Sequence, residues 1–177
     1  NIFQLKISLE QENNWGYRCY YEDDRLHFLI RREPTLNPIN PLEGITIAVD
    51  PGHGGDETGA ISPLGVLEKD INIQWAESLS QILRQHGAYV LLTRQGDETV
   101  SLPARAKAAE NSNALLYISL HNNGVTPHGN AEAASGTSTF FTLPQNKDLT
   151  WAIYPHMVDL GLSPYGRIYN SYFVTNA

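Results

Sequence analysis

Three short apolar runs, separated by longer segments of mixed character, constrain the fold more than any other feature of this sequence. Each run has the length and the apolar content of a strand that is buried on both faces. The runs are ITIAVD at 45–50, AYVLLTR at 88–94 and ALLYISL at 114–120. Because strands that alternate with helices usually lie parallel in one sheet, this order predicts an α/β fold with a largely parallel sheet flanked by helices.

The segments between these runs are predicted to be helices. The first covers 70–86, where Asp70 would cap its start and Gly87 would end it. Apolar residues recur there at helical spacing and predict one buried face, formed by Ile71, Trp75, Leu79, Ile82, Leu83 and His86. The second helix begins at Ser101 and continues through about Glu110.

The remaining parts of the chain suggest a division into two regions. We predict a β-strand appendage with a proline-rich linker over residues 1–44, followed by a domain of alternating strands and helices over 45–177. Further elements are predicted from alternating or apolar residues: strands at 3–9, 17–21, 26–31 and 136–143, and a helix at 145–161.

Composition excludes several classes of protein. A chain of 177 residues suits one domain with a small appendage. The net charge of −7 argues against nucleic acid as the main partner, and no apolar run is long enough for a transmembrane segment. Cys19 is the single cysteine, which excludes an internal disulfide and a cysteine-rich metal site. The sequence is silent on the oligomeric state.

The loop DPGHGGDETGA, residues 50–60, directly follows the first predicted strand. A glycine-rich loop in this position first suggests phosphate binding, but the dinucleotide pattern requires glycine where Glu57 stands. No Lys-Ser or Lys-Thr pair follows, so a P-loop is excluded as well. The acids Asp50, Asp56 and Glu57 would also repel phosphate. The loop is therefore better suited to a cation.

Two histidines and one glutamate are placed where they could bind that cation. His53 and His121 follow the first and third predicted strands, and ligands of open α/β sheets gather at such strand ends. Glu68 stands where the long loop returns to the first helix. Together they would form a tetrahedral zinc site with one position open. Taken singly, each has a simpler interpretation, as a surface histidine or as an acid favoured at a helix start.

A set of motifs in the same order resembles the zinc-dependent N-acetylmuramoyl-L-alanine amidases of the cell-wall hydrolase (amidase_3) type. The motifs are DPGHGGDETGA, GVLEKD, TRQGD with SLPARAKAAE, and YISLHNN, and the resemblance covers about 45–177. It implies a phosphorylase/hydrolase-like fold and zinc ligation by His53, Glu68 and His121. Asn123 matches a family asparagine and is the candidate substrate-binding residue.

The resemblance also implies a reaction and a place in the cell. Members of this family cleave the amide between N-acetylmuramic acid and L-alanine in peptidoglycan, with zinc as the cofactor. We therefore expect a hydrolase of the cell envelope that takes part in peptidoglycan catabolism and cell wall organisation, located in the periplasm or outside the cell. Muropeptides of the cell wall would be its substrate.

One departure from the family concerns the catalytic residue. The family's general-base glutamate lies on a late strand, and this sequence reaches Ala177 without a matching glutamate, so we expect a C-terminally truncated domain. Glu132 is the nearby acid that would substitute, although a solvated loop residue is the simpler interpretation. Two alternatives stay open: a zinc-dependent peptidoglycan-binding module that does not hydrolyse, and a zinc carboxypeptidase-like peptidase.

Four residues near these motifs are expected to support the site. Arg94 and Arg105 match the family and are interpreted as structural residues that pair with acids near the loops. Asp50 and Ser119 are the candidates for accepting hydrogen bonds from the imidazoles of the two histidine ligands.

Overall fold

The structure is a computed structural model that describes residues 4–124, 135–173 and 175. It divides into two compact units, Asn1–Thr35 and Leu36–Ala177. The division falls within the predicted proline-rich linker. The predicted functional division, into an appendage over residues 1–44 and a catalytic domain over 45–177, stays a prediction.

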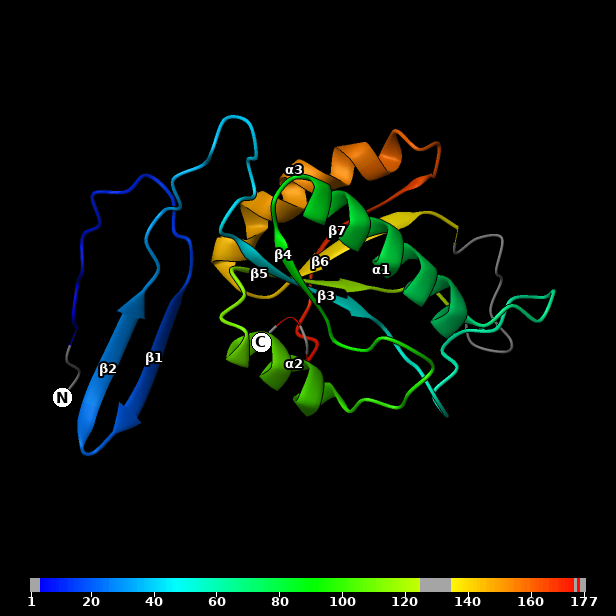
Figure 1. Cartoon of the computed structure of the whole chain (residues 1–177), viewed down its shortest axis with the longest axis horizontal. Coiled ribbons are helices and arrows are strands. Elements are labelled where there is room, and N and C mark those ends of the chain that lie inside the picture. The colour runs from blue at the N-terminus through cyan, green and yellow to red at the C-terminus, as the bar shows by residue number, and fades with distance from the viewer. Residues whose placement is uncertain (1–3, 125–134, 174, 176–177) are drawn as a thin grey trace. The chain divides into compact units, whose positions relative to one another are not determined.

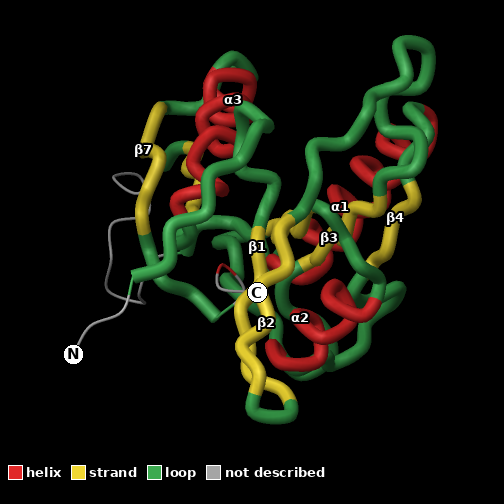
Figure 2. The backbone as a smooth tube through the Cα atoms, turned by 90° about the vertical axis from the view of Figure 1, so that its left-hand side faces the viewer, coloured by secondary structure: helices red, strands yellow, loops and turns green. Residues whose placement is uncertain are grey.

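The first unit contains one antiparallel hairpin. It is formed by β1 (Tyr17–Glu22) and β2 (Arg25–Ile30), joined by Asp23 and Asp24, which both adopt positive φ angles (Figure 2). Both predicted strands are confirmed. The predicted strand at 3–9 is wrong over its described part, because residues 4–9 pair with no strand and their side chains are exposed. Alternating polarity becomes a strand only where a neighbouring strand accepts its hydrogen bonds.

The second unit contains the predicted parallel sheet (Figure 1). β3 (Thr46–Pro51) lies at its centre, between β4 (Tyr89–Leu92) and β5 (Leu116–Leu120), and both pairings are parallel. The core gathers on this sheet, around the buried residues Ile45, Ile47, Val49, Ala76 and Ala88. The predicted α/β fold with parallel strands is therefore confirmed.

A second, two-stranded parallel sheet follows in the chain. β6 (Thr137–Phe141) pairs with β7 (Pro164–Tyr169), and α3 (Lys147–Val158) packs against both after the short 3-10 helix η1 (Pro144–Asn146). The sequence predicted β6 and α3 but not β7. Its residues PYGRIY include proline and glycine, which are depleted from strands.

The helix α1 (Glu68–Gln85) packs against β3 and β4, but its start differs from the prediction. The cap position is Leu67, and no side chain caps the helix. The predicted cap, Asp70, instead lies in the first turn together with Glu68, where acidic side chains interact favourably with the helix dipole.

The buried face of α1 also differs from the predicted one. Three residues of the predicted face are exposed: Trp75 and Ile82, at 51% and 52%, and His86, which follows the last turn. The small side chains of Ala76 and Ser80 are fully buried instead, and Leu79 and Leu83 pack beside them. The small residues let the helix lie close to the sheet.

The helix α2 (Leu102–Asn111) begins where the sequence predicted it. Ser101 caps it by accepting a hydrogen bond from the amide of Ala104. Within the described part of the chain, no helix combines the length and the apolar character needed to cross a membrane.

Candidate metal centre

The structure brings His53, Glu68 and His121 together at one edge of the parallel sheet. His53 follows β3, His121 follows β5, and Glu68 is the first residue of α1. His53 Nε2 lies 3.3 Å from Glu68 Oε1, and His121 Nδ1 lies 3.0 Å from the same oxygen. One ligand atom from each residue falls within 4.8 Å of the others. The two imidazole rings meet edge to face.

The three side chains differ in their access to solvent. The carboxylate of Glu68 is almost fully buried, with 4% of its side chain exposed. The imidazole of His53 is 27% exposed, and that of His121 is 45% exposed. The carboxylate therefore lies on the buried side of the cluster, and the imidazoles lie on its solvent-exposed side.

The buried carboxylate of Glu68 is held in its ionised form. The amide of Ala60 donates to Oε2 over 2.8 Å, and the amide of Asn122 donates to Oε1 over 2.9 Å. Burial alone would raise the pKa of Glu68, but hydrogen bonds from His121, Ala60 and Asn122 and the charge of His53 lower this pKa to about 2. The cluster therefore contains an anion at neutral pH.

The donor set and the two ligand separations around Glu68 fit a zinc ion. Two imidazoles and one carboxylate are a common set of ligands at catalytic zinc sites. Ligand atoms about 2.0–2.1 Å from a tetrahedral zinc lie about 3.3 Å from one another. The separations of 3.3 Å and 3.0 Å around Glu68 Oε1 are close to this value. The solvent-facing side leaves room for a fourth ligand.

Two buried arginines hold the loop that carries His53. Arg105 donates to Asp50 Oδ1 and to the carbonyl of Pro51, each over 2.8 Å, and to the carbonyl of His53 over 2.6 Å. Arg94 donates to the carbonyls of Pro51 and Gly52. His53 itself has a φ of 63°, an unusual conformation for a residue with a side chain, so these bonds hold the backbone in a strained geometry.

These contacts confirm one of the expected supporting roles and correct others. Arg105 pairs with an acid, Asp50, as predicted. Arg94, in contrast, donates hydrogen bonds from its buried guanidinium to backbone carbonyls. Asp50 and Ser119 do not support the histidines: Ser119 donates to Asp50, and the other bonds to this carboxylate come from Thr93 and Arg105.

The two remaining site predictions concern Asn123 and Glu132. Asn123 lies two residues after His121, and its side-chain amide donates to the carbonyl of Gly136 over 3.2 Å. Its role in binding substrate stays a prediction. Glu132 lies outside the described residues.

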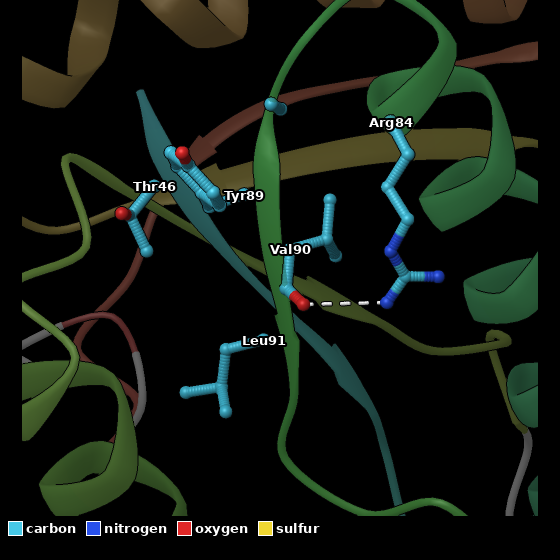
Figure 3. A pocket seen from close by; sticks show the side chains of 6 residues that line it. Thr46, Arg84, Tyr89, Val90 and Leu91 are labelled. Atoms are coloured by element: carbon cyan, nitrogen blue, oxygen red, sulfur yellow. Dashed lines mark hydrogen bonds between the residues drawn. The ribbon is translucent and has the colours of Figure 1, made fainter. Parts of the chain in front are cut away.

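A pocket of about 380 Å³ elsewhere on this unit is not part of the cluster. Thr46, Tyr89 and Arg84 are among the residues that line it, and Arg84 donates to the carbonyl of Val90 there (Figure 3). Thr46 and Tyr89 begin β3 and β4, so the pocket lies at the opposite ends of the strands from His53. Ligands of parallel sheets bind at the carboxyl ends instead.

Two residues whose contacts with the ligands were not predicted, Asn72 and Gly52, help to assemble the cluster. Asn72 is fully buried and contacts Gly52, Glu68 and Asn122. Its spacing of four residues from Glu68 places both on one helix face, which is a signal that the sequence contains. Gly52 leaves the space that the His121 ring fills, since a Cβ at this position would overlap the imidazole.

Comparison with known proteins identifies the family. The sequence model of a family described as N-acetylmuramoyl-L-alanine amidase (Amidase_3) matches residues 47–175. The chain is 37% identical to an uncharacterized protein, YqiI, of Bacillus subtilis over 61% of this chain and 50% of that protein. It is 42% identical to the N-acetylmuramoyl-L-alanine amidase AmiA of Escherichia coli over 53% of this chain and 31% of that protein.

A solved structure supports the same relationship. The N-acetylmuramoyl-L-alanine amidase AmiC2 of Nostoc punctiforme aligns with a TM-score of 0.70 and 29% identity, over 75% of this chain and 73% of that one. The chain spans half or less of the length of the two curated relatives described above. The match of the family model, which covers most of the sequence, shows that this chain belongs to the N-acetylmuramoyl-L-alanine amidase family.

Proposed function

We propose that this protein hydrolyses the amide bond between N-acetylmuramic acid and L-alanine in peptidoglycan, with a zinc ion bound by His53, Glu68 and His121. The observation that carries the proposal is the convergence of these three ligand side chains at one edge of the sheet. Membership in the amidase family supports the choice of substrate and reaction.

The geometry of the cluster suits this chemistry. A zinc ion bound there would supply Lewis acidity, polarising the scissile carbonyl and lowering the pKa of a water molecule. Glu68 would contribute a negative charge from the buried side, and the neutral imidazoles of His53 and His121 would complete the ligand set. Substrate would approach from the solvent side. Asn123, an exposed residue two positions after His121, is the candidate for binding it.

The proposed substrate also sets the expected location. Because peptidoglycan lies outside the cytoplasmic membrane, the protein would act in the periplasm or at the cell wall. Peptidoglycan is its proposed partner, and the net charge of −7 disfavours a nucleic acid.

The reaction is tested with purified peptidoglycan. We expect the zinc-loaded protein to release stem peptides with a new amino-terminal L-alanine, detected by labelling of free amines and mass spectrometry. Peptides that lack muramic acid should stay intact, because they lack the lactyl amide. Cleavage of those peptides at a free carboxyl end would contradict the proposal and favour the carboxypeptidase-like alternative.

One observation favours a second candidate, a module that binds peptidoglycan without hydrolysing it. Within the described residues, Glu68 is the single carboxylate of the cluster, and both its oxygens accept hydrogen bonds. A general base, which contributes about 10²–10⁴-fold in rate, would therefore come from another acid. Co-sedimentation with intact peptidoglycan, without release of stem peptides, would identify the binding module. A loss of release on Glu132→Gln would identify Glu132 as that acid.

The packing of Gly52 against His121 predicts the effect of a single methyl group. Gly52→Ala should push the imidazole away from Glu68, since His121 is half exposed and has room to turn outward. We expect zinc affinity to fall about tenfold or more, the scale seen when groups that orient a ligand are changed. Titration with a zinc-competing chelator measures this.

Gly96→Ala is the matched control. Gly96 also lies in a loop of this unit, but a Cβ there would meet nothing within 4 Å. This variant should bind zinc as the wild type does. Equal zinc affinity of Gly52→Ala and Gly96→Ala would contradict the packing argument.

A further inference from the structure

A single buried amide connects the three segments that carry the candidate ligands. Asn72 lies one turn after Glu68 in α1, and none of its surface is exposed. A fully buried polar side chain is costly unless its hydrogen-bonding groups are satisfied, so its partners indicate why it is tolerated.

The partners of Asn72 are the ligand Glu68 and the neighbours of the other two ligands. Its Nδ2 donates to the carbonyl of Gly52 over 3.2 Å, and it lies 3.4 Å from Glu68 Oε1. Its Oδ1 accepts a hydrogen bond from Asn122 Nδ2 over 3.0 Å. Gly52 directly precedes His53, and Asn122 directly follows His121.

The chemistry of these contacts requires an amide. Two neighbours, Gly52 and Glu68, present acceptors, while Asn122 presents a donor. An asparagine side chain supplies two donors and an acceptor in one rigid plane. Aspartate would offer no donor and would place a second negative charge beside Glu68.

We propose that Asn72 is a positioning residue that sets the distance between Glu68 and the two histidines. It acts through Gly52 on the segment of His53 and through Asn122 on the segment of His121, while it orients the Glu68 carboxylate directly. This inference rests on the proposed function, because it assumes that the cluster binds zinc. Asn72 is not one of the three candidate ligands, and its full burial keeps it away from the solvent side from which substrate would approach.

The experiment compares Asn72→Ala, Asn122→Ala and the double variant with the wild type. Asn122→Ala removes the side chain that contacts Asn72 but keeps the backbone amide that donates to Glu68. It also tests the proposal if Asn72→Ala fails to fold, since Asn122 is only partly buried. Zinc affinity is measured by chelator competition, and the visible absorption of the Co²⁺-loaded protein reports the coordination geometry.

Ser80→Ala is the matched control for removing a buried polar group from the same helix face. Ser80 is fully buried in α1, and its hydroxyl has no hydrogen-bond partner within the described structure. Its loss should leave both the zinc affinity and the Co²⁺ spectrum unchanged.

We expect Asn72→Ala to lower zinc affinity about 10- to 100-fold and to change the Co²⁺ spectrum. Asn122→Ala should act in the same direction with a smaller effect. The losses in the double variant should be less than additive, because both substitutions break the same hydrogen bond. If the wild type binds no zinc, the proposed function fails. If it binds zinc and the three variants match its affinity and spectrum, the metal site stands and the role of Asn72 is overturned.

Discussion

Replacing His53 with alanine is expected to remove nearly all of the zinc that the proposed site would bind, about one ion per chain in the unaltered protein. The cluster provides only three ligand side chains within the described residues, so the loss of one leaves Glu68 and His121 alone. Two protein ligands bind zinc far more weakly than three. His121→Ala should have the same effect, since the two imidazoles lie at similar distances from Glu68 Oε1.

Elemental analysis after dialysis against metal-free buffer measures the zinc content of each variant. His86→Ala is the control, because His86 is an exposed histidine at the far end of α1 from Glu68. It should retain the wild-type zinc content. Full zinc occupancy in His53→Ala would show that the ion binds elsewhere and would remove the basis of the proposed site.

The second large effect concerns the buried ion pair behind the loop of His53. Arg105→Leu should lower the free energy of unfolding by about 3–5 kcal/mol, the usual result of removing one partner of a buried pair. Asp50 and Arg105 are 1% and 2% exposed, so Asp50 would remain buried without its cation. The carbonyls of Pro51 and His53 would also lose donors. Urea unfolding monitored by fluorescence measures the difference.

A control and a pH dependence make this prediction specific. Lys107→Ala, which removes an exposed pair with Glu110 in the same helix, should cost at most about 0.5 kcal/mol. Burial alone would raise the pKa of Asp50, but hydrogen bonds from Thr93, Ser119 and Arg105 lower this pKa below its usual value. Its contribution to stability is therefore present above the unfolded pKa of about 4 and is lost as the pH falls below it. Arg105→Leu should weaken this acid-dependent loss, and an unchanged unfolding midpoint would contradict the role of the pair.

Local patterns in the sequence were sufficient to predict most elements of the second unit. The apolar runs that become β3, β4 and β5 are recognisable because a strand buried on both faces needs little else than a short stretch of apolar residues. The cap at Ser101 is equally local, since its hydroxyl bonds to an amide three residues away.

The predicted metal ligands relied on two further kinds of information. His53 and His121 follow parallel strands, and this topology alone places them at one edge of the sheet. Glu68 offers a weaker signal, because an acid at a helix start also has a simple dipole explanation. Its position, where the long loop returns to the helix, suggested it as a ligand, and the family resemblance supported that choice. The structure places it between the two histidines.

From the sequence alone one can derive the order of strands and α-helices from β3 to α3, the parallel sheet and the segments that carry the candidate ligands. Three features depend on tertiary packing: the buried face of α1, the formation of β7, and the absence of a strand over residues 4–9. The tertiary structure also decided that Asp50 pairs with Arg105, 55 residues away, and that Asn72 connects three segments. The physical reason is that periodicity and capping depend on near neighbours in the chain. The partner of a buried polar group depends instead on which distant segments the fold brings within hydrogen-bonding distance.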